Sequence, residues 1–483
     1  MIDDASEPET SDRPQAVHQP EAPSRSARLL RELTHRDHTQ GRLLVSILVL
    51  ALPPVVASSG HALFQLVDLN FLGELGGDAV AAAGATNQTL RQAFMVVAFG
   101  MSVAIQMMIA FSVGRSEIDE AERVAGQSFL VTGVLALLSI ATVGLFPEFF
   151  VSLIVSEEAI PVASTYARIT MLFFGFNVFA QAANGVLVGS GDAATPMVIG
   201  LSQVPVAIFA EWVLTFGHFG LPALGVAGIA YGAALGGAFS CTLAMTVLFS
   251  GRSRVHLRAR HLVPDWTMIR RIASTSWQPA LQMIARSAMI MVFMTLAGRI
   301  GSHVQAAYTI GLRIEMIAVM IAFPIANACA TLVGQNLGAG DVGRAWHAVR
   351  VAASVEIAFL GPAALLLYFL RDSAVAVFTD DPAVAAEAAN YLGYVSTILW
   401  FWGVYFVAFR TLQASGDMVT PMVISLVIAL GVGAPLAVWL SAKPEYGASG
   451  MWIASVVYSV LNTMLMLAWL MTGRWAERAA AGR

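Results

Sequence analysis

The chain has 483 residues, of which 57% are hydrophobic and only 12% are charged, and its formal net charge is −4. Soluble proteins carry roughly a quarter charged residues, so this composition excludes a soluble globule of that size. The slightly acidic balance also excludes a strongly basic nucleic-acid-binding protein, and we expect no nucleic-acid partner. The chain is therefore predicted to be an integral membrane protein surrounded by lipid.

The fold class follows from the shape of the apolar stretches. Lipid admits only helices and closed barrels, because every backbone polar group must be bonded internally. Barrel strands alternate apolar and polar residues, whereas these stretches stay apolar for roughly 20 residues, the length of a spanning helix. We therefore predict an all-α membrane protein.

In chain order, the first predicted element is a polar tail. Residues 1–42 are rich in Pro, Ser, Glu and Asp and predict a disordered cytoplasmic segment. A polar linker at 251–270 divides the rest into six-helix bundles at 43–250 and 271–473, and 474–483 form a second cytoplasmic tail. The twelve expected spans are 43–72, 79–112, 122–146, 160–188, 195–217, 222–250, 271–299, 304–334, 345–370, 384–412, 420–441 and 447–473.

The basic residues orient these spans. Of the 27 Lys and Arg residues, twenty lie in segments on the face that holds both termini, four lie inside spans, and three lie on the opposite face: Arg299, Arg371 and Lys443. Cytoplasmic loops carry an excess of Lys and Arg. We therefore expect a multi-pass protein of the cytoplasmic (inner) membrane with both termini in the cytoplasm.

An internal repeat relates the two halves. Residues 190–199 (SGDAATPMVI) recur as residues 415–424 (SGDMVTPMVI) at an offset of 225, and the same offset takes Pro54 onto Pro279. Because each half holds an even number of spans, the halves are parallel repeats, related by an axis along the membrane normal. Two such six-helix repeats around a central cleft are typical of alternating-access transporters.

Three features in this order resemble the multidrug and toxic compound extrusion (MATE) family over nearly all of the chain after residue 40. They are Pro54 with Val67-Asp68 and GELG at 73–76, VGQNLGAG at 333–340, and the repeated SGDxxTP turn. The resemblance is to prokaryotic members with a cation site in the N-terminal half. It implies a secondary antiporter that exports small organic, often cationic, compounds in exchange for H⁺ or Na⁺. We expect a monomer without a cofactor.

Two carboxylates are the candidate coupling site. Asp68 in span one and Glu211 in span five lie roughly 8 and 9 Å from the outer ends of their spans. Two carboxylates at one depth can share a proton or hold a cation between them. The resemblance implies the same pair, with Tyr166 beside it. Two positions that carry neutral oxygen ligands in the archaeal-type site hold Ala207 and Ala233 here, which favours H⁺, with Na⁺ at Asp68 and Glu211 as the alternative.

Other polar and aromatic residues inside the spans are weaker candidates. Arg286 and Glu315 both fall near mid-membrane and predict a structural ion pair, with a substrate contact by Arg286 as the alternative. The candidates for the cavity and the substrate are Gln181, Asn184, Gln282, Trp277 and Trp402.

Rival functions make different demands on the sequence. A lipid-linked-sugar flippase of the same superfamily often has many cationic cavity residues and extra helices, and neither is evident here. A membrane receptor or scaffold belongs to another class, and a scaffold needs no buried carboxylates at matching depth. No P-loop occurs, and Asp192 lacks the Tyr-Asp partner that an intramembrane aspartyl protease needs, so we expect no enzyme.

Overall fold

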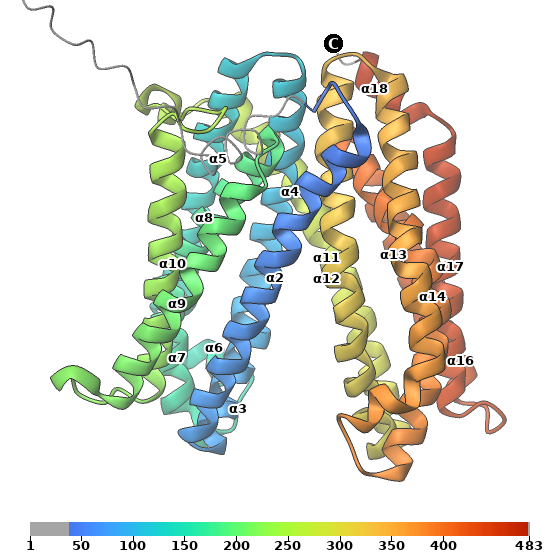
Figure 1. Cartoon of the computed structure of the whole chain (residues 1–483). Helices are drawn as coiled ribbons and strands as arrows, with labels where there is room; N and C mark the ends of the chain where they lie inside the picture. Colours follow the sequence, from blue (N-terminus) through green and yellow to red (C-terminus); the bar gives the residue numbers. More distant parts are fainter. Residues whose placement is uncertain (1–37, 482–483) are drawn as a thin grey trace, which may run out of the picture.

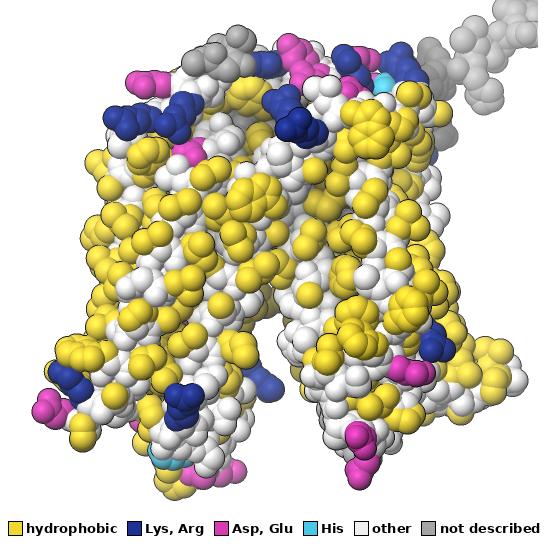
Figure 2. Space-filling view, turned by 180° about the vertical axis from the view of Figure 1, so that it is seen from behind, with side chains coloured by type: hydrophobic (Ala, Val, Ile, Leu, Met, Phe, Trp, Pro, Cys, Tyr) yellow, Lys and Arg dark blue, Asp and Glu magenta, His cyan; other side chains and the backbone are white. Residues whose placement is uncertain are grey.

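The computed structural model describes residues 38–481, and all regular elements in that range are helical (Figure 1). The disordered tail predicted for residues 1–42 lies almost wholly outside the described residues. Helices α2 to α10 form one bundle and α11 to α17 form the other. The bundles meet at the end of the molecule that carries the termini and separate toward the opposite end, where a cleft opens between them (Figures 1 and 2).

The N-terminal bundle contains the first six predicted spans. Its elements are α2 (Leu43–Glu74), α3 (Gly77–Thr86), the π-helical turn η1 (Asn87–Arg91), α4 (Gln92–Gly114), α5 (Ile118–Ser139), η2 (Ile140–Gly144), α6 (Pro147–Val151), η3 (Glu157–Ala159), α7 (Ile160–Leu172), α8 (Phe174–Ser190), α9 (Ala194–Phe216), η4 (His218–Gly220) and α10 (Val226–Phe249).

The C-terminal bundle follows a linker with one short turn. Its elements are η5 (Ala259–Leu262), α11 (Trp266–Ile300), α12 (Ser302–Gly338), α13 (Val342–Ala376), α14 (Pro382–Ala414), α15 (Val419–Ile428), η6 (Ala429–Gly433), α16 (Ala434–Ser441), α17 (Ala448–Met471) and α18 (Arg474–Ala481).

Eleven stretches of helix in the described part of the chain are long and apolar enough to cross a membrane. A twelfth span is formed by two helical segments, 157–172 and 174–190, which are bent by 44° relative to each other. Counted in this way, the structure agrees with the twelve predicted spans. Hydrophobic side chains cover the middle of both bundles, as expected of surfaces that face lipid (Figure 2).

The repeated SGDxxTP turn forms the same hydrogen bond at the start of a helix in both halves. In the first copy, the Asp192 carboxylate accepts hydrogen bonds from the backbone N–H of Thr195 at 2.9 Å and from its hydroxyl at 2.6 Å. In the second copy, Asp417 accepts from the backbone N–H of Thr420 at 3.2 Å. These bonds satisfy N–H groups that have no partner within the helix.

Two boundaries differ from the prediction. Helix α11 begins at Trp266, inside the predicted linker, because the Asp265 side chain caps it by accepting from the N–H groups of Thr267 and Met268. The predicted C-terminal tail is helical as α18 (Arg474–Ala481). Trp475 anchors this helix, since its side chain is 1% exposed and packs against Trp346 with the ring centres 5.0 Å apart.

Candidate functional site

The structure brings Asp68, Glu211 and Tyr166 together from α2, α9 and α7. The charges of Asp68 and Glu211 interact with each other, and the Tyr166 hydroxyl interacts with both. Tyr166 is 4% exposed, and its hydroxyl accepts a hydrogen bond of 2.8 Å from the Asn87 amide. The three residues selected from the sequence thus share one polar site near the end of the N-terminal bundle that lies away from the termini.

Glu211 is the most deeply buried member of this site. Its side chain is 0% exposed, and neither carboxyl oxygen has a hydrogen-bond partner among the described residues. Glu211 is buried because α9 packs closely against α10. Residue 232 of α10 is a glycine at this contact, and a side chain there would overlap the Glu211 backbone. One helical turn further along α9, the Thr215 hydroxyl is also buried without a described partner.

Arg91 and Asn87 complete the site, and the sequence analysis did not select either residue. Both belong to the π-helical turn η1 in the second span, and such turns occur often at functional sites. Arg91 interacts electrostatically with Asp68 and with Tyr166, so a fixed cation accompanies the two carboxylates. Arg91 could have been selected from the sequence, because an arginine inside a span is a functional candidate by default.

A cavity lies in the C-terminal bundle, and four of the remaining candidates line it. It has a volume of about 140 Å³, and Gln282, Trp402 and Arg286 line it together with Glu315. The Gln282 amide also donates to the Ser425 hydroxyl at 3.1 Å.

The predicted ion pair between Arg286 and Glu315 is not among the ion pairs formed by residues 38–481. Glu315 instead accepts a hydrogen bond of 2.6 Å from the Tyr391 hydroxyl. The Arg286 guanidinium lies over the Trp402 ring, 5.7 Å from its centre. The two charges therefore line one cavity and interact electrostatically, but their nearest polar or aromatic contacts are Tyr391 and Trp402 of α14.

The other cavity candidates are more scattered. Gln181 and Asn184 are half-buried on α8, and the Gln181 backbone oxygen accepts from the Ser102 hydroxyl at 3.0 Å. Trp277 is 50% exposed on α11, and it does not line the cavity described above.

A polar network closes the seam between the two bundles at the end that carries the termini. Arg410 of α14 is 2% exposed and donates to the Gln106 side chain of α4 at 2.6 Å and to Gln413 at 2.6 Å. Gln106 in turn donates to the Thr331 hydroxyl of α12 at 3.0 Å. Arg410 is one of the twenty basic residues that the sequence analysis counts on the face with both termini, whereas the structure buries it between the bundles.

Helices α4 and α12 also touch backbone to backbone across this seam. A Cβ atom added at Gly114 would overlap the backbone carbonyl of Gln335, and one added at Gly334 would lie 2.8 Å from the Cβ of Ala110. Gln335 belongs to the VGQNLGAG segment, and its side chain donates to the Gly189 oxygen at 3.1 Å. The small residues of this segment therefore permit the tight closure seen here.

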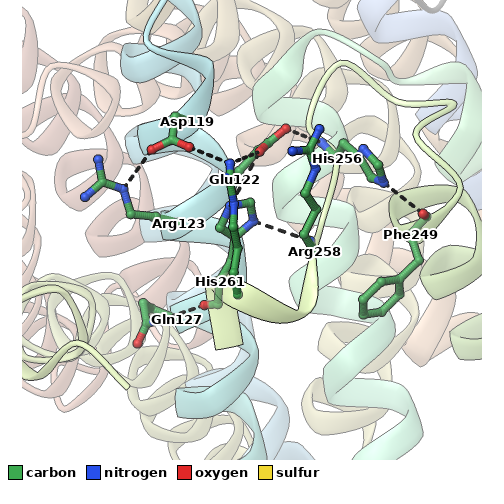
Figure 3. A network of polar contacts seen from close by, with 9 residues as sticks. Asp119, Glu122, Arg123, Gln127, Phe249, His256, Arg258 and His261 are labelled. Atoms are coloured by element: carbon green, nitrogen blue, oxygen red, sulfur yellow. Dashed lines mark hydrogen bonds and ion pairs between the residues drawn. The ribbon is translucent and has the colours of Figure 1, made fainter. Parts of the chain in front are cut away.

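The linker between the bundles is attached to α5 by a separate polar network (Figure 3). The Gln127 amide donates to the backbone oxygens of His261 and Val263 at 2.7 and 2.8 Å, and its oxygen accepts from the Asp265 N–H at 2.9 Å. The Glu122 carboxylate accepts from the backbone N–H of His256 at 3.2 Å. These contacts hold the linker on the N-terminal bundle.

One group in this network has the composition of a metal site. Asp119, Glu122 and His261 offer ligand atoms that lie within 4.8 Å of one another. However, Arg260 donates to Asp119 at 2.9 Å and, through its Nε atom, to His261 at 2.8 Å. A guanidinium thus already supplies positive charge to these groups, and we assign no metal to them.

The linker network predicts a pH dependence of stability. Burial lowers the pKa of His261 below its ordinary value of 6.5, and the nearby Arg260 and Arg258 add to this effect, while Glu122 and Asp119 oppose it. The unfolded chain therefore binds this proton more readily, so stability is lost as the pH falls below 6.5. Thermal unfolding in detergent at pH 5.5 and 7.5 should show this loss, and His261→Gln should reduce the difference between the two pH values. An unchanged difference would contradict the assignment.

Comparison with known sequences gives one family model that matches the chain twice. The MatE model matches residues 53–213 and residues 279–439. The "Probable multidrug resistance protein NorM" of Thermotoga maritima is 24% identical over 446 residues, covering 90% of this chain and 94% of that protein. The "Multidrug resistance protein NorM" of Burkholderia vietnamiensis is 25% identical over 453 residues, covering 90% and 95%.

Solved structures share this fold. One described as "Outward-facing conformation of a multidrug resistance MATE family transporter of the MOP superfamily" has a TM-score of 0.83 and 20% identity, covering 92% of this chain and 97% of that chain. Another, "Crystal structure of MATE in the bent conformation", has a TM-score of 0.85 and 20% identity, covering 92% and 98%. At this identity, the similarity supports the two-repeat helical fold.

Proposed function

The chain belongs to the MatE family, and from this premise we propose that it is a secondary antiporter that exports small organic compounds, often cationic, in exchange for an inward-moving cation. Asp68 and Glu211 are the proposed coupling groups. The observation that carries this assignment is the buried Glu211 carboxyl, which has no described hydrogen-bond partner and interacts with Asp68. An ionisable residue inside a span is costly, so its retention points to a function.

Protons are the proposed coupling ion. Arg91 supplies a fixed positive charge near Asp68, and a second cation would be repelled at close range. Glu211 meets no described donor or cation, so the neutral, protonated form suits its surroundings in this conformation. A proton also needs no shell of oxygen ligands, which agrees with alanine at positions 207 and 233.

Sodium is the second candidate, and a specific observation favours it. The Asn87 side-chain oxygen and the Thr215 hydroxyl are buried without described hydrogen-bond partners, as are both oxygens of Glu211. Neutral oxygens and carboxylates are the ligands that hard cations prefer. The two candidates differ in which gradient drives transport.

The proposed cycle uses the seam and the cleft in alternation. The bundles are closed at the end of the termini by Arg410, Gln106 and the contact of α4 with α12, while the cleft is open at the other end (Figure 2). In this state, the cation would enter from outside to Asp68 and Glu211 while the exported compound leaves. Opening of the seam would then expose the cleft to the cytoplasm.

The proposed setting is the cytoplasmic membrane, with both termini in the cytoplasm. The basic residues of the linker and both chain ends support this orientation. We propose a monomer without a cofactor and without enzymatic activity, in agreement with relatives whose names describe multidrug resistance proteins. A flippase, a receptor and a scaffold gain no support from these relatives.

Transport in vesicles tests this function and its coupling ion together. The full-length chain is reconstituted in sealed vesicles, and uptake of ethidium is followed while a pH gradient and a Na⁺ gradient are imposed separately. The proposal predicts transport driven by the pH gradient without Na⁺. Transport that follows only the Na⁺ gradient would favour the second candidate, and transport with neither gradient would contradict an antiporter.

A further inference from the structure

The cavity in the C-terminal bundle has a chemistry that the coupling site does not use. It lies among α11, α12, α14 and α17, and Phe99 of α4 also lines it, so the cavity reaches the boundary between the bundles. Its volume of about 140 Å³ is close to that of an engineered protein cavity that accepts benzene. It can therefore hold one aromatic ring.

The repeat shows how this cavity differs from the coupling site. Tyr391 follows Tyr166 by the repeat offset of 225, and both hydroxyls form hydrogen bonds at the corresponding place in their bundles. The same offset takes Asp68 onto Phe293, which lines the cavity, and Glu211 onto Leu436. The C-terminal half thus has no carboxylate at either corresponding position, and the cavity contains one of these positions.

Arg286 places a positive charge in this cavity, where it interacts at longer range with the charge of Glu315. Within the part of the chain that the structure describes, its guanidinium forms neither an ion pair nor a hydrogen bond, and its contact is the Trp402 ring. A cation inside a span is costly to insert into the membrane. A carboxylate on a ligand would offset this cost, because a guanidinium binds carboxylates through two parallel hydrogen bonds.

Glu315 and Asn462 add acceptors to the same cavity. Tyr391 occupies one oxygen of Glu315 and leaves the other available. The side-chain oxygen of Asn462 is buried without a described partner. Both acceptors suit the N–H groups of a protonated amine.

Aromatic rings form a wall of the same cavity. Tyr308 and Tyr391 pack against Trp452 with ring centres 5.5 and 4.5 Å apart, and Phe293 packs against Tyr308 at 6.2 Å. All four rings line the cavity. Such a wall binds a flat aromatic ring by stacking and edge contacts.

We propose that this cavity binds aromatic ampholytes, with Arg286 holding the ligand carboxylate, Glu315 holding its ammonium group and the aromatic wall holding its ring. The inference extends the proposed function by assigning a class of exported compound to a site separate from Asp68 and Glu211. An ampholyte satisfies the cation and the anion of the cavity together, whereas a simple organic cation leaves Arg286 unpaired.

Three single-ring probes test the proposal by binding alone. They are 4-(aminomethyl)benzoate, 4-methylbenzylamine and 4-methylbenzoate, which differ only in their charged groups. Dissociation constants are measured by ligand-observed NMR on the full-length chain in detergent, without any gradient. We expect the ampholyte to bind about tenfold more tightly than either singly charged probe. Equal affinity of the amine and the ampholyte for the wild-type protein would overturn the proposal.

Variants assign the charges to the residues. Arg286→Met should remove the advantage of the ampholyte over 4-methylbenzylamine, and Glu315→Gln should remove its advantage over 4-methylbenzoate. Asp68→Asn should leave all three affinities unchanged, since it lies in the other bundle. Loss of the ampholyte preference in Asp68→Asn, or its survival in Arg286→Met, would overturn the assignment. Because binding needs no gradient, this result is independent of whether the proposed antiport is observed.

Discussion

Glu211→Gln is expected to abolish gradient-driven export while leaving normal amounts of protein in the membrane. Glutamine keeps the shape of the side chain but cannot take up or release a proton. Burial supports this choice of residue, because the ionised form of a carboxyl that is 0% exposed loses several kcal/mol of solvation, so its protonation state depends on the conformation. Efflux of ethidium from energised cells, normalised to membrane protein, measures the loss.

Asp68→Asn should produce the same loss, since Asp68 and Glu211 act as one interacting pair. Glu356→Gln is the matched control. Glu356 lies in α13 of the other bundle, is also 0% exposed, and has no described hydrogen-bond partner at either carboxyl oxygen. It therefore reports the effect of neutralising any buried carboxyl. Wild-type efflux from both Asp68→Asn and Glu211→Gln, or equal loss in Glu356→Gln, would contradict the coupling site.

That Asp68 and Glu211 lie close together could be predicted from the sequence, because depth along a helix is a simple count. Asp68 and Glu211 lie at similar distances from the outer ends of their spans, and the structure finds them interacting. Arg91 could have been found by the same count, since it lies inside the second span. Its π-helical turn could not, because no local pattern distinguishes residues 87–91 from the regular helix around them.

The ion pair expected between Arg286 and Glu315 shows the limit of such counting. Depth does not say which face of a helix a residue occupies or which neighbour lies nearest. Here Tyr391, from a helix far along the chain, donates to Glu315, and Trp402 lies beside Arg286. Contacts between separate helices depend on how they pack, and that packing is not encoded in the position of one residue.

The seam between the bundles was missed for a related reason. Arg410 and Gln106 are 304 positions apart and form their hydrogen bond only when the bundles meet at this end. From the sequence, Arg410 reads as a basic residue near the end of a span, and Gln106 as a polar residue within one. The repeat predicted two bundles with a cleft between them. It did not predict at which end the bundles meet and at which end the cleft is open.

Gly114→Val is expected to open this seam and to stop export. The added Cβ overlaps the backbone carbonyl of Gln335, which belongs to α12 and cannot rotate away as a flexible side chain could. The two helices must separate, and the Arg410 to Gln106 bond across the same seam is then stretched or lost. The variant should favour the conformation in which the bundles part at the end of the termini and approach each other at the other end.

Distances between the bundles measure this shift. Spin labels on cysteines at Leu221 and Phe378, which are exposed near the outer ends of the two bundles, should move closer together in Gly114→Val. The native Cys241 and Cys329 are replaced by alanine first. Gly431→Val is the control, because a Cβ at Gly431 meets nothing within 4 Å. An unchanged label distance in Gly114→Val would show that the α4–α12 contact does not control the opening. A shortened distance with export retained would show that this closure is not needed for transport.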